Sequence, residues 1–494
     1  MKISKYILSG VTAIALSTSF CSCGDSYLDT KYYRGVDVDG ALTTPELIQT
    51  ALTGTYNNLY DYRFAGNYAV SIGDIPTDLT YWNTLTGHWD GIYQFSFDET
   101  DLYLDAIWEY GYKVVDNSAR IIVAADALLP NASDAVKKEL NAEMAEAYAL
   151  RAYANLVLVN VFSHQVKVAG NDFSDKPGLV VVNEPIPALS QVERSTVGAT
   201  YESIVSDLKK SIACFGVAGA AGTDKCVFTK AAAEGLLARA YLYLEDWNNA
   251  KTYAQAALVD AGITALTYTA EAYKALYNGE GSNTESFFYL AIDASHNWSA
   301  RSCGTLYSTY NFSPSPKLLA MYQNTDVRKS IQGWDKTSKT DVPVYGAGKY
   351  AAYASGNPAN ATCYLINAPE MYLIIAEAEL NAGTVANAQA ALLNVAKRNT
   401  AITSVADLPD TKEALYSFLK EERARELFQE GLRLWDLRRW GDKVSVEAYS
   451  APEVKFHVNN YNISDLVYPI PASEINAGFG VEQNDWAKTV PAIE

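Results

Sequence analysis

The sequence contains few of the residues and motifs that mark common enzyme sites. Its 494 residues include only four histidines, which lie too far apart along the chain to predict a metal cluster: His88, His164, His296 and His457. There is no Gly-x-Ser-x-Gly elbow, no His-Glu-x-x-His pair and no phosphate-binding loop. The sequence therefore does not indicate a serine hydrolase, a zinc protease or a nucleotide-dependent enzyme.

Positive charge is also scarce. The chain has 39 Lys and Arg residues against 57 Asp and Glu residues, which gives a net charge of -18. Nucleic-acid binding depends on cationic contacts to phosphate, so this balance argues against a nucleic-acid partner. It argues equally against an electrostatic hold on an anionic membrane surface. With 49% hydrophobic residues, however, the chain can build a large core.

Long apolar runs are missing after the first twenty residues. Lys2 and Lys5 precede a mostly apolar stretch over residues 6–20. A positive start followed by a short apolar stretch is typical of a secretory signal, and the stretch is shorter than the ~20 residues that span a bilayer. We expect a lipoprotein signal peptide over residues 1–22 and an exported chain without a transmembrane helix.

Two cysteines, Cys21 and Cys23, end this apolar stretch. Signal peptides that end at a cysteine resemble bacterial lipoprotein signals, in which that cysteine is acylated with fatty acids such as palmitate. Phe20 is too bulky to precede the acylated residue, whereas Ser22 is small. Cys23 is therefore the predicted lipidation site. An ordinary cleaved signal that leaves Cys23 as a free thiol is the alternative.

Four further cysteines are scattered through the chain: Cys214, Cys226, Cys303 and Cys363. Export would allow them to oxidise, but their positions do not define a pairing. Cys214 and Cys226 flank a short Gly-Ala loop and could close it. Free buried thiols are the alternative.

Helical periodicity dominates the rest of the sequence. Thr44 followed by Pro45 predicts a helix start for residues 44–60. Apolar spacing predicts further helices over residues 101–129, from a Ser133 cap to Phe162, and over residues 201–215.

Two stretches have the spacing of tetratricopeptide helical hairpins. Small residues at such positions let two helices approach closely, and an aromatic ring fills the groove between them. In residues 228–258 and 371–399 these positions are Ala238, Tyr241, Ala250 and Ala257, then Ala376, Ala388 and Val395. The predicted fold class is all-α, with tetratricopeptide-type hairpins forming a single-lobed scaffold.

Two long segments interrupt this helical pattern. Residues 71–95 and 295–364 are rich in Gly, Ser, Pro, Asn, Tyr and Trp and mostly lack a helical period. Long irregular segments within a folded chain are usually functional. We therefore expect the scaffold to carry aromatic-rich loop insertions.

Five motifs in order along the chain resemble those of one known family. They are CGDSYLDT (residues 23–30), EMAEAYALRAYANLVLVNVF (143–162), FTKAAAEGLLARAYLY (228–243), EERARELFQEGLRLWDLRRWG (421–441) and YPIPASEINAG (468–478). The chain resembles the SusD/RagB-type outer-membrane lipoproteins, which capture nutrients beside a TonB-dependent transporter. The resemblance implies one SusD-like domain over residues 23–494. An N-terminal part, about 23–215, and a C-terminal part, about 228–494, would interleave in one lobe.

The same resemblance implies a function. The protein would be anchored by lipid in the outer membrane, exposed at the cell surface, and would pass a bound glycan to a SusC-like transporter. It would need no cofactor, no metal and no catalytic residue. Peptides or another nutrient polymer are the alternative ligands. A glycoside hydrolase, with two carboxyl groups ~5–9.5 Å apart, and a helical scaffold for protein partners are further alternatives.

Glycan-binding members of the family use aromatic side chains as platforms. The apolar face of a sugar ring stacks on a π face, while amide, carboxylate or guanidinium groups meet its hydroxyls. The irregular segments supply the candidate ligand-binding residues. These are Asp78, Tyr81, Trp82, Asn83 and Trp89 in the first, and Trp298, Arg301, Tyr307, Tyr310 and Trp334 in the second.

Residues 421–441 carry many charges on predicted helix. Glu421 and Arg425 are one turn apart in a favourable order for an ion pair, and further arginines surround them. We interpret this segment as a structural ion-pair network with Trp435 and Trp440 packed beneath it. An anion or substrate site is the alternative.

Overall fold

A computed structural model of the protein describes most of the chain after residue 40. The described residues are 41–81, 86–219, 222–279, 281–310, 312–332, 334–335, 344–345, 348–447 and 457–491. The predicted signal peptide (residues 1–22), Cys23, Trp82 and Asn83 lie outside them. Residues 44–494 form one compact unit.

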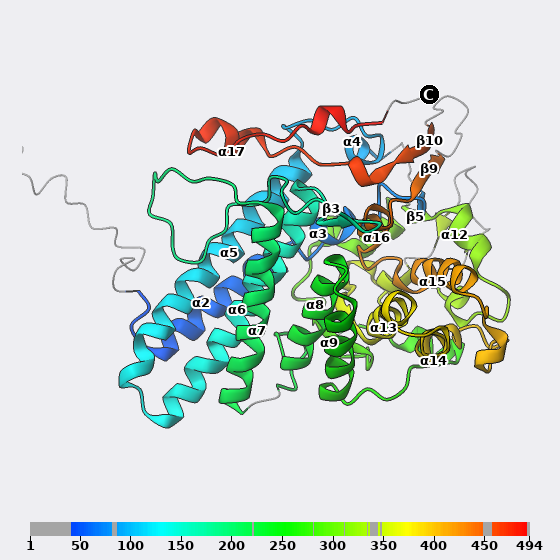
Figure 1. The fold of residues 1–494 in the computed structure, drawn as a ribbon, viewed down its shortest axis with the longest axis horizontal. Coiled ribbons are helices and arrows are strands. Elements are labelled where there is room, and N and C mark those ends of the chain that lie inside the picture. The colour runs from blue at the N-terminus through cyan, green and yellow to red at the C-terminus, as the bar shows by residue number, and fades with distance from the viewer. Residues whose placement is uncertain are drawn as a thin grey trace, which may run out of the picture. The chain divides into compact units, whose positions relative to one another are not determined.

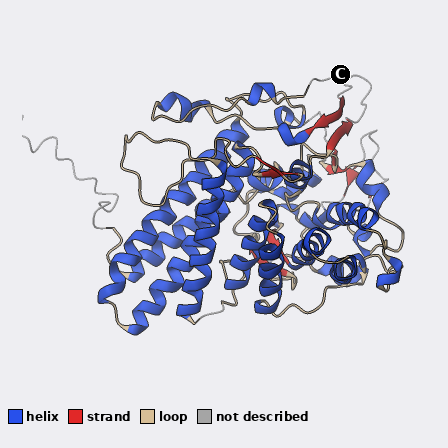
Figure 2. Cartoon of the chain, viewed as in Figure 1, coloured by secondary structure: helices blue, strands red, loops and turns tan. Residues whose placement is uncertain are grey.

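Helices dominate this unit, which confirms the all-α prediction (Figures 1 and 2). Four long helices pack against one another: α2 (Pro45–Tyr60), α5 (Leu102–Leu128), α6 (Asp134–Phe162) and α7 (Val197–Ala218). A second group continues from α7: α8 (Lys230–Tyr243), α9 (Trp247–Asp260), α13 (Ala368–Ala382), α14 (Val385–Ala396), α15 (Lys412–Leu427) and α16 (Arg433–Trp440). Within the described residues, no helix combines the length and apolarity that a membrane span requires.

Side-chain caps explain where the long helices begin. The hydroxyls of Thr44 and Ser133 and the carboxylate of Asp101 each accept a hydrogen bond from a backbone N–H of the first turn. Helix α7 begins earlier than the predicted Tyr201. There the Thr196 hydroxyl caps the helix, although Gly198 in its first turn has a low helix propensity.

The two tetratricopeptide-type hairpins form as predicted. In the α8–α9 hairpin, Ala238, Ala250 and Ala257 are fully buried, and the Tyr241 ring stacks on Tyr253 with 5.7 Å between centroids. In the α13–α14 hairpin the three small residues of the motif are fully buried as well: Ala376, Ala388 and Val395. Helix α9 packs on α13, so the hairpins are neighbours in space although the second irregular segment separates them in sequence.

Short helices and short antiparallel strand pairs lie in the irregular segments and also between the longer helices. The short helices of the unit are α3 (Tyr68–Ser71), α4 (Asp90–Tyr93), α10 (Ala270–Ala275), α11 (Cys303–Ser308), α12 (Pro316–Met321) and α17 (Ala472–Ala477). The pairs are β1 (Thr80–Tyr81) with β5 (Ser313–Pro314), β2 (Lys167–Val168) with β3 (Asn171–Asp172), β4 (Ser286–Leu290) with β8 (Cys363–Asn367), β6 (Trp334–Asp335) with β7 (Val344–Tyr345), and β9 (Lys443–Glu447) with β10 (His457–Asn462). Thr80 lies opposite Pro314, so β1 and β5 join the two irregular segments to each other.

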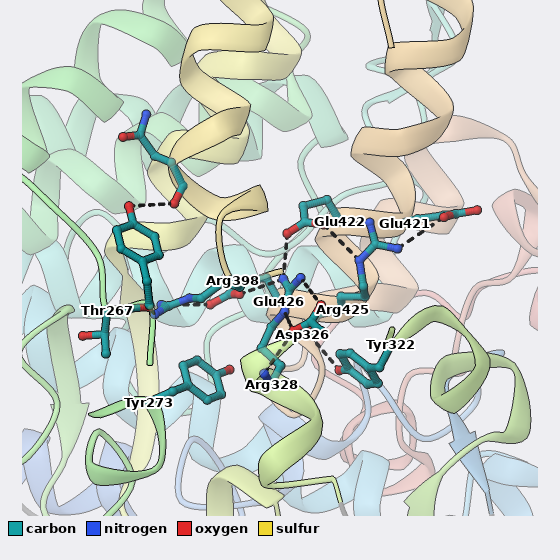
Figure 3. A network of polar contacts seen from close by, with 12 residues as sticks. Thr267, Tyr273, Tyr322, Asp326, Arg328, Arg398, Glu421, Glu422, Arg425 and Glu426 are labelled. Carbon is teal, nitrogen blue, oxygen red and sulfur yellow. Dashed lines mark hydrogen bonds and ion pairs between the residues drawn. The ribbon is translucent and has the colours of Figure 1, made fainter. Parts of the chain in front are cut away.

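A buried network of ion pairs surrounds α15 (Figure 3). The guanidinium of Arg328 lies 2.7 Å from Glu422 and 3.0 Å from Glu426, and it also pairs with Asp326 at 2.7 Å. Arg398, at the end of α14, reaches Glu426 from the other side. Both arginine side chains are 1% exposed or less. The loop that carries Arg328 and the residues after α14 that carry Arg398 are thereby fixed to α15.

A second set of buried pairs joins α15 and α16 to α13. Arg439 contacts both carboxylate oxygens of Glu377, at 2.6 and 2.7 Å, and Trp440 donates its indole N–H to the same carboxylate at 2.8 Å. Burial raises the pKa of Glu377, but Arg439 and Arg423 outweigh it and hold that pKa at about 2. These contacts confirm that residues 421–441 form a structural network.

Glu143, in the middle of α6, lacks such a partner. Its side chain is 2% exposed, and neither carboxylate oxygen has a hydrogen-bond partner among the described residues. Burial first, and then the charges of Glu139, Glu146 and Glu46, raise the pKa of Glu143 from 4.5 to about 7. The charged form of Glu143 is therefore unfavourable in the folded protein.

The substitution Glu143→Gln tests this assignment. Because the folded pKa lies above the unfolded one, the contribution of Glu143 to stability is complete below pH 4.5 and is lost as the pH rises through about 7. We expect the variant to raise the free energy of unfolding at pH 8.5 by on the order of 2 kcal/mol and to change it little at pH 5. Urea unfolding at both pH values measures the difference. Glu202→Gln, at an exposed glutamate of α7, is the control. An equal effect of Glu143→Gln at both pH values would contradict the assignment.

Candidate ligand-binding cleft

An aromatic cleft opens where the end of α2, the start of α5 and the second irregular segment meet. It has a volume of about 330 Å³. Its lining includes Tyr62, Arg63, Asn67, Tyr68, His88, Trp89, Leu102, Tyr103, Arg301, Leu306 and Tyr310. The described lining residues include no Asp or Glu.

One wall is built around the Tyr62 ring. The Arg301 guanidinium lies over this ring at 4.8 Å from its centroid, and it donates a hydrogen bond to the Tyr62 hydroxyl. Trp298 supports the ring from behind, with 5.7 Å between centroids, and donates its indole N–H to the Tyr60 carbonyl at 3.1 Å. The side-chain amide of Asn67 donates to the Arg301 carbonyl at 2.7 Å, which fixes the backbone that carries the arginine.

The opposite wall is a stack of rings at the start of α5. Trp89 and Tyr103 are nearly parallel, with centroids 4.0 Å apart, and the Tyr68 ring meets both by its edge. The backbone of Trp89 is left-handed, with φ of 61°, and its N–H donates to the Tyr103 hydroxyl at 3.1 Å. Leu102, next to this stack, is 80% exposed. The wall therefore offers solvent an apolar edge.

His88 and Tyr310 form a further part of the cleft lining, with ring centroids 4.0 Å apart. Burial lowers the pKa of His88, so its imidazole is neutral at pH 7. Burial likewise raises the pKa of Tyr68 and of Tyr103. Arg63 is paired with Asp61 at 2.8 Å, whereas no ion pair joins Arg301 to a carboxylate among the described residues. The cleft thus combines neutral rings with one exposed guanidinium.

The structure places the predicted ligand-binding residues unevenly. Trp89, Arg301 and Tyr310 line the cleft, and Trp298 stands behind its Tyr62 wall. Trp89 is only 1% exposed, so it supports Tyr103 rather than presenting its own face. Tyr81 and Trp334 are described in their backbone alone, in β1 and β6, and Trp82 and Asn83 lie outside the described residues.

Two of the predicted residues need correction. Asp78 is 5% exposed, and its carboxylate pairs with Arg433 at 2.9 Å and with Lys317 at 2.6 Å. Burial raises the pKa of Asp78, but these two cations outweigh it and hold that pKa well below its usual range. Tyr307 is 2% exposed and packs against Tyr350 and other interior rings. Neither side chain presents a surface to a ligand.

Sequence reasoning missed several lining residues: Tyr62, Tyr68, His88 and Tyr103. Tyr103 lies within the predicted helix over residues 101–129, outside the irregular segments that supplied the candidates. Tyr62 and Tyr68 belong to the stretch YDYRFAGNY (residues 60–68), which has three tyrosines and follows a helix end. That local density of rings outside helical spacing was the available signal.

Other hollows of the unit have a different character. One lies beside α5, α6 and α7, and another beside α12 and α15, each with a volume of about 760 Å³. Their described linings are mostly charged and short polar side chains with one aromatic ring each, Tyr148 and Phe418. Within the same described residues, no group of three or more His, Cys, Asp or Glu side chains could hold a metal ion.

Family comparison agrees with the motifs of the sequence. Residues 26–242 match a family described as starch-binding and associating with the outer membrane, and residues 246–486 match the SusD family. The chain belongs to the SusD/RagB family. A SusD-like protein of Bacteroides ovatus is 24% identical over 324 residues, which cover 63% of this chain and 53% of that protein. The matched region therefore spans about half the length of that relative.

Solved structures share the fold. A SusD superfamily protein of Bacteroides thetaiotaomicron superposes with a TM-score of 0.77 at 23% identity, covering 89% of this chain and 99% of that one. A SusD-like carbohydrate-binding protein of Bacteroides vulgatus superposes with a TM-score of 0.73 at 18% identity, covering 89% of this chain and 98% of that one. At these identities the likeness establishes the fold.

Titration of the histidines tests the electrostatics of the cleft. Burial lowers the pKa of His88 below 6.5, and burial together with Arg438 lowers that of His164 to about 4. We expect both imidazoles to be neutral at pH 7 in an NMR titration, with His164 remaining neutral down to about pH 4.5. The variants His88→Gln and His164→Gln assign the two resonances. A His88 imidazole that remains protonated above pH 7 would contradict the lowered pKa of this residue.

Proposed function

We propose that this protein is a cell-surface lipoprotein of the outer membrane that binds a glycan without chemical change. It then passes the glycan to a SusC-like TonB-dependent transporter. The observation that carries this proposal is the cleft, in which aromatic rings and the guanidiniums of Arg63 and Arg301 line an open volume of about 330 Å³. The family to which the chain belongs, and the carbohydrate-binding description of one structural neighbour, support the choice of ligand.

The physical chemistry of the cleft suits a sugar chain. The C–H face of a pyranose can stack on Tyr62 or Tyr103, and the Arg301 guanidinium and the His88 imidazole can meet hydroxyls at the edges. Each aromatic contact contributes about 0.5–1.5 kcal/mol beyond the buried area. A few such contacts give a Kd on the order of mM to μM. Weak binding suits a protein that must release its ligand to a partner.

The arrangement of charges favours binding over hydrolysis. A glycoside hydrolase needs two carboxyl groups that flank the scissile bond. The described lining of the cleft has no carboxylate, and Asp61, which precedes Tyr62 in sequence, is engaged by Arg63 through two hydrogen bonds of 2.8 and 2.9 Å. An open aromatic cleft with an arginine also suits a peptide with acidic or aromatic side chains. Peptide or another nutrient polymer is therefore the second candidate ligand.

Substitutions of Tyr62 test the stacking platform. We expect Tyr62→Ala to weaken glycan binding roughly 3- to 10-fold, because it removes one aromatic contact. Tyr62→Phe keeps the ring face and should bind within about twofold of the native protein. Calorimetry with maltoheptaose, a xylo-oligosaccharide and a manno-oligosaccharide measures the affinities. Tyr253→Ala, in the α8–α9 hairpin, is the control for a tyrosine outside the cleft.

The same measurement separates the candidate ligands. Binding of a tryptic protein digest, but of none of the three oligosaccharides, would favour the peptide alternative. Equal glycan affinity of Tyr62→Ala and the native protein would exclude this cleft as the site. Release of reducing ends during incubation with a bound oligosaccharide would overturn the non-catalytic proposal.

Anchoring and partnership have their own test. Acylation at Cys23 predicts that radiolabelled palmitate enters the native protein and Cys21→Ala, but not Cys23→Ala. Stable anchoring to a membrane takes several acyl chains. Because Cys23→Ala would carry none, we expect this variant to leave the membrane fraction. Copurification of a TonB-dependent transporter with the solubilised native protein would support the partnership. Palmitate labelling of Cys23→Ala would contradict the assigned anchor.

A further inference from the structure

Two cysteines from distant parts of the chain meet close to the Tyr62 wall of the cleft, which carries Arg301. Cys303 opens α11 and Cys363 opens β8, and they are 60 residues apart in sequence. Each is 1% exposed. Their sulfur atoms are 3.9 Å apart, which is van der Waals contact, although the structure contains both as thiols.

Their surroundings hold the two sulfur atoms together. The carbonyl oxygen of Gly66 accepts from both thiols, at 3.5 Å from Cys303 and 3.3 Å from Cys363. A Cβ atom on Gly304 would lie 1.9 Å from the carbonyl oxygen of Pro358, so the first turn of α11 packs directly on the chain that leads into β8. The backbone segments that carry the two cysteines are therefore held close together.

We propose that Cys303 and Cys363 form a disulfide bond in the exported protein. The proposal rests on the predicted export and does not depend on the identity of the ligand. The two sulfur atoms, 3.9 Å apart as thiols, would approach to the bonding distance of about 2.05 Å as the disulfide forms. The bond removes two weak S–H donors from Gly66, which is a small loss beside a covalent link.

The oxidation is a thiol–disulfide exchange with a disulfide-bearing oxidant of the cell envelope. One cysteine thiolate attacks the oxidant disulfide and forms a mixed disulfide, releasing one oxidant thiolate. The second cysteine thiolate then attacks the mixed disulfide, forms the Cys303–Cys363 bond and releases the other. The two cysteines lose two protons and two electrons, and the oxidant disulfide is reduced to a dithiol.

The timing of this step follows from burial. The hydrogen bond to Cys303, together with burial, raises the pKa of the Cys363 thiol well above its ordinary value. The thiolate is the attacking species, so exchange is slow once the chain has folded. The bond therefore forms while the exported chain folds.

The bond would stabilise the geometry of the cleft. Arg301 lies two residues before Cys303, and Leu306 of α11 also lines the cleft. On the other side, Gly66 precedes Asn67, whose amide fixes the Arg301 carbonyl. A covalent link from α11 to β8 thus anchors the Tyr62 wall, through the backbone of Arg301, to the interior. The cross-link also closes the loop that contains most of the second irregular segment, which restricts the unfolded chain.

Peptide mapping of the full chain tests the proposal. The protein is purified from the cell envelope, denatured without reductant in iodoacetamide, and digested. We expect one cross-linked peptide that contains Cys303 and Cys363, which separates into two alkylated peptides only after reduction. Cleavage between the two cysteines should give fragments that migrate together on a gel without reductant and separately with it.

Single substitutions provide matched controls. Cys303→Ser should expose Cys363 to alkylation without reductant, whereas Cys214→Ser, at a half-buried cysteine on α7, should leave the cross-link intact. Alkylation of both Cys303 and Cys363 in the unreduced native protein would overturn the proposal. That result needs no variant, so it holds even where Cys303→Ser fails to fold.

Discussion

Buried guanidinium groups need a fixed set of acceptors, and this requirement organises the half of the molecule that carries α15 and α16. Arg328 and Arg398 are matched by carboxylates of α15, whereas Arg438 donates to the carbonyls of Asn160 and Ser163 at the end of α6. The last carbonyls of a helix lack partners within the helix, so Arg438 satisfies acceptors that would otherwise be buried unpaired. Burial lowers the pKa of Arg438 to about 10, which still leaves it charged. Such pairs add little net stability, but the loss of one partner costs about 3–5 kcal/mol. Their main effect is therefore to select one arrangement of loops.

This network reaches the cleft through Asp78. Arg433 of α16 holds Asp78 in the first irregular segment, and Lys317 of α12 holds it from the second. Two residues after Asp78, β1 pairs with β5 and joins the same two segments through their backbones. The rings of the cleft come from these segments and from the ends of α2 and α5. Asp78 and the β1–β5 pair thus join the two irregular segments that supply rings of the cleft.

Regular parts of this fold could be predicted from the sequence because their signals are local. Thr44, Asp101 and Ser133 mark helix starts by their own side chains, and Ala250 and Ala388 mark close helix packing by their size. The cleft could not be predicted in the same way. Asp78 lies among aromatic and polar residues in sequence, yet in three dimensions it faces Arg433 from a helix more than 350 residues away. Tyr103 belongs to the predicted helix over residues 101–129, yet its ring stacks on Trp89 of the first irregular segment and lines the cleft. In both cases the deciding contact is long-range, and one sequence contains no local sign of it.

The structure separates the residues that hold the fold from those that shape the surface of the cleft. Exposed Leu102 and half-buried Tyr310 contribute cleft surface and satisfy no buried charge, so other side chains at these positions would change the surface that a ligand meets and leave the ion-pair network complete. Asp78 allows no such freedom, because its loss would leave Arg433 buried without a paired carboxylate. Loss of Glu377 would leave buried Arg439 with Asp436 as its remaining carboxylate partner. Trp298 and Asn67 lie between these two classes, since they position Tyr62 and Arg301 by contact rather than by charge. A change at Trp298 would disorder the Tyr62 wall, whereas a change at Asn67, which itself lines the cleft, would alter the cleft surface as well.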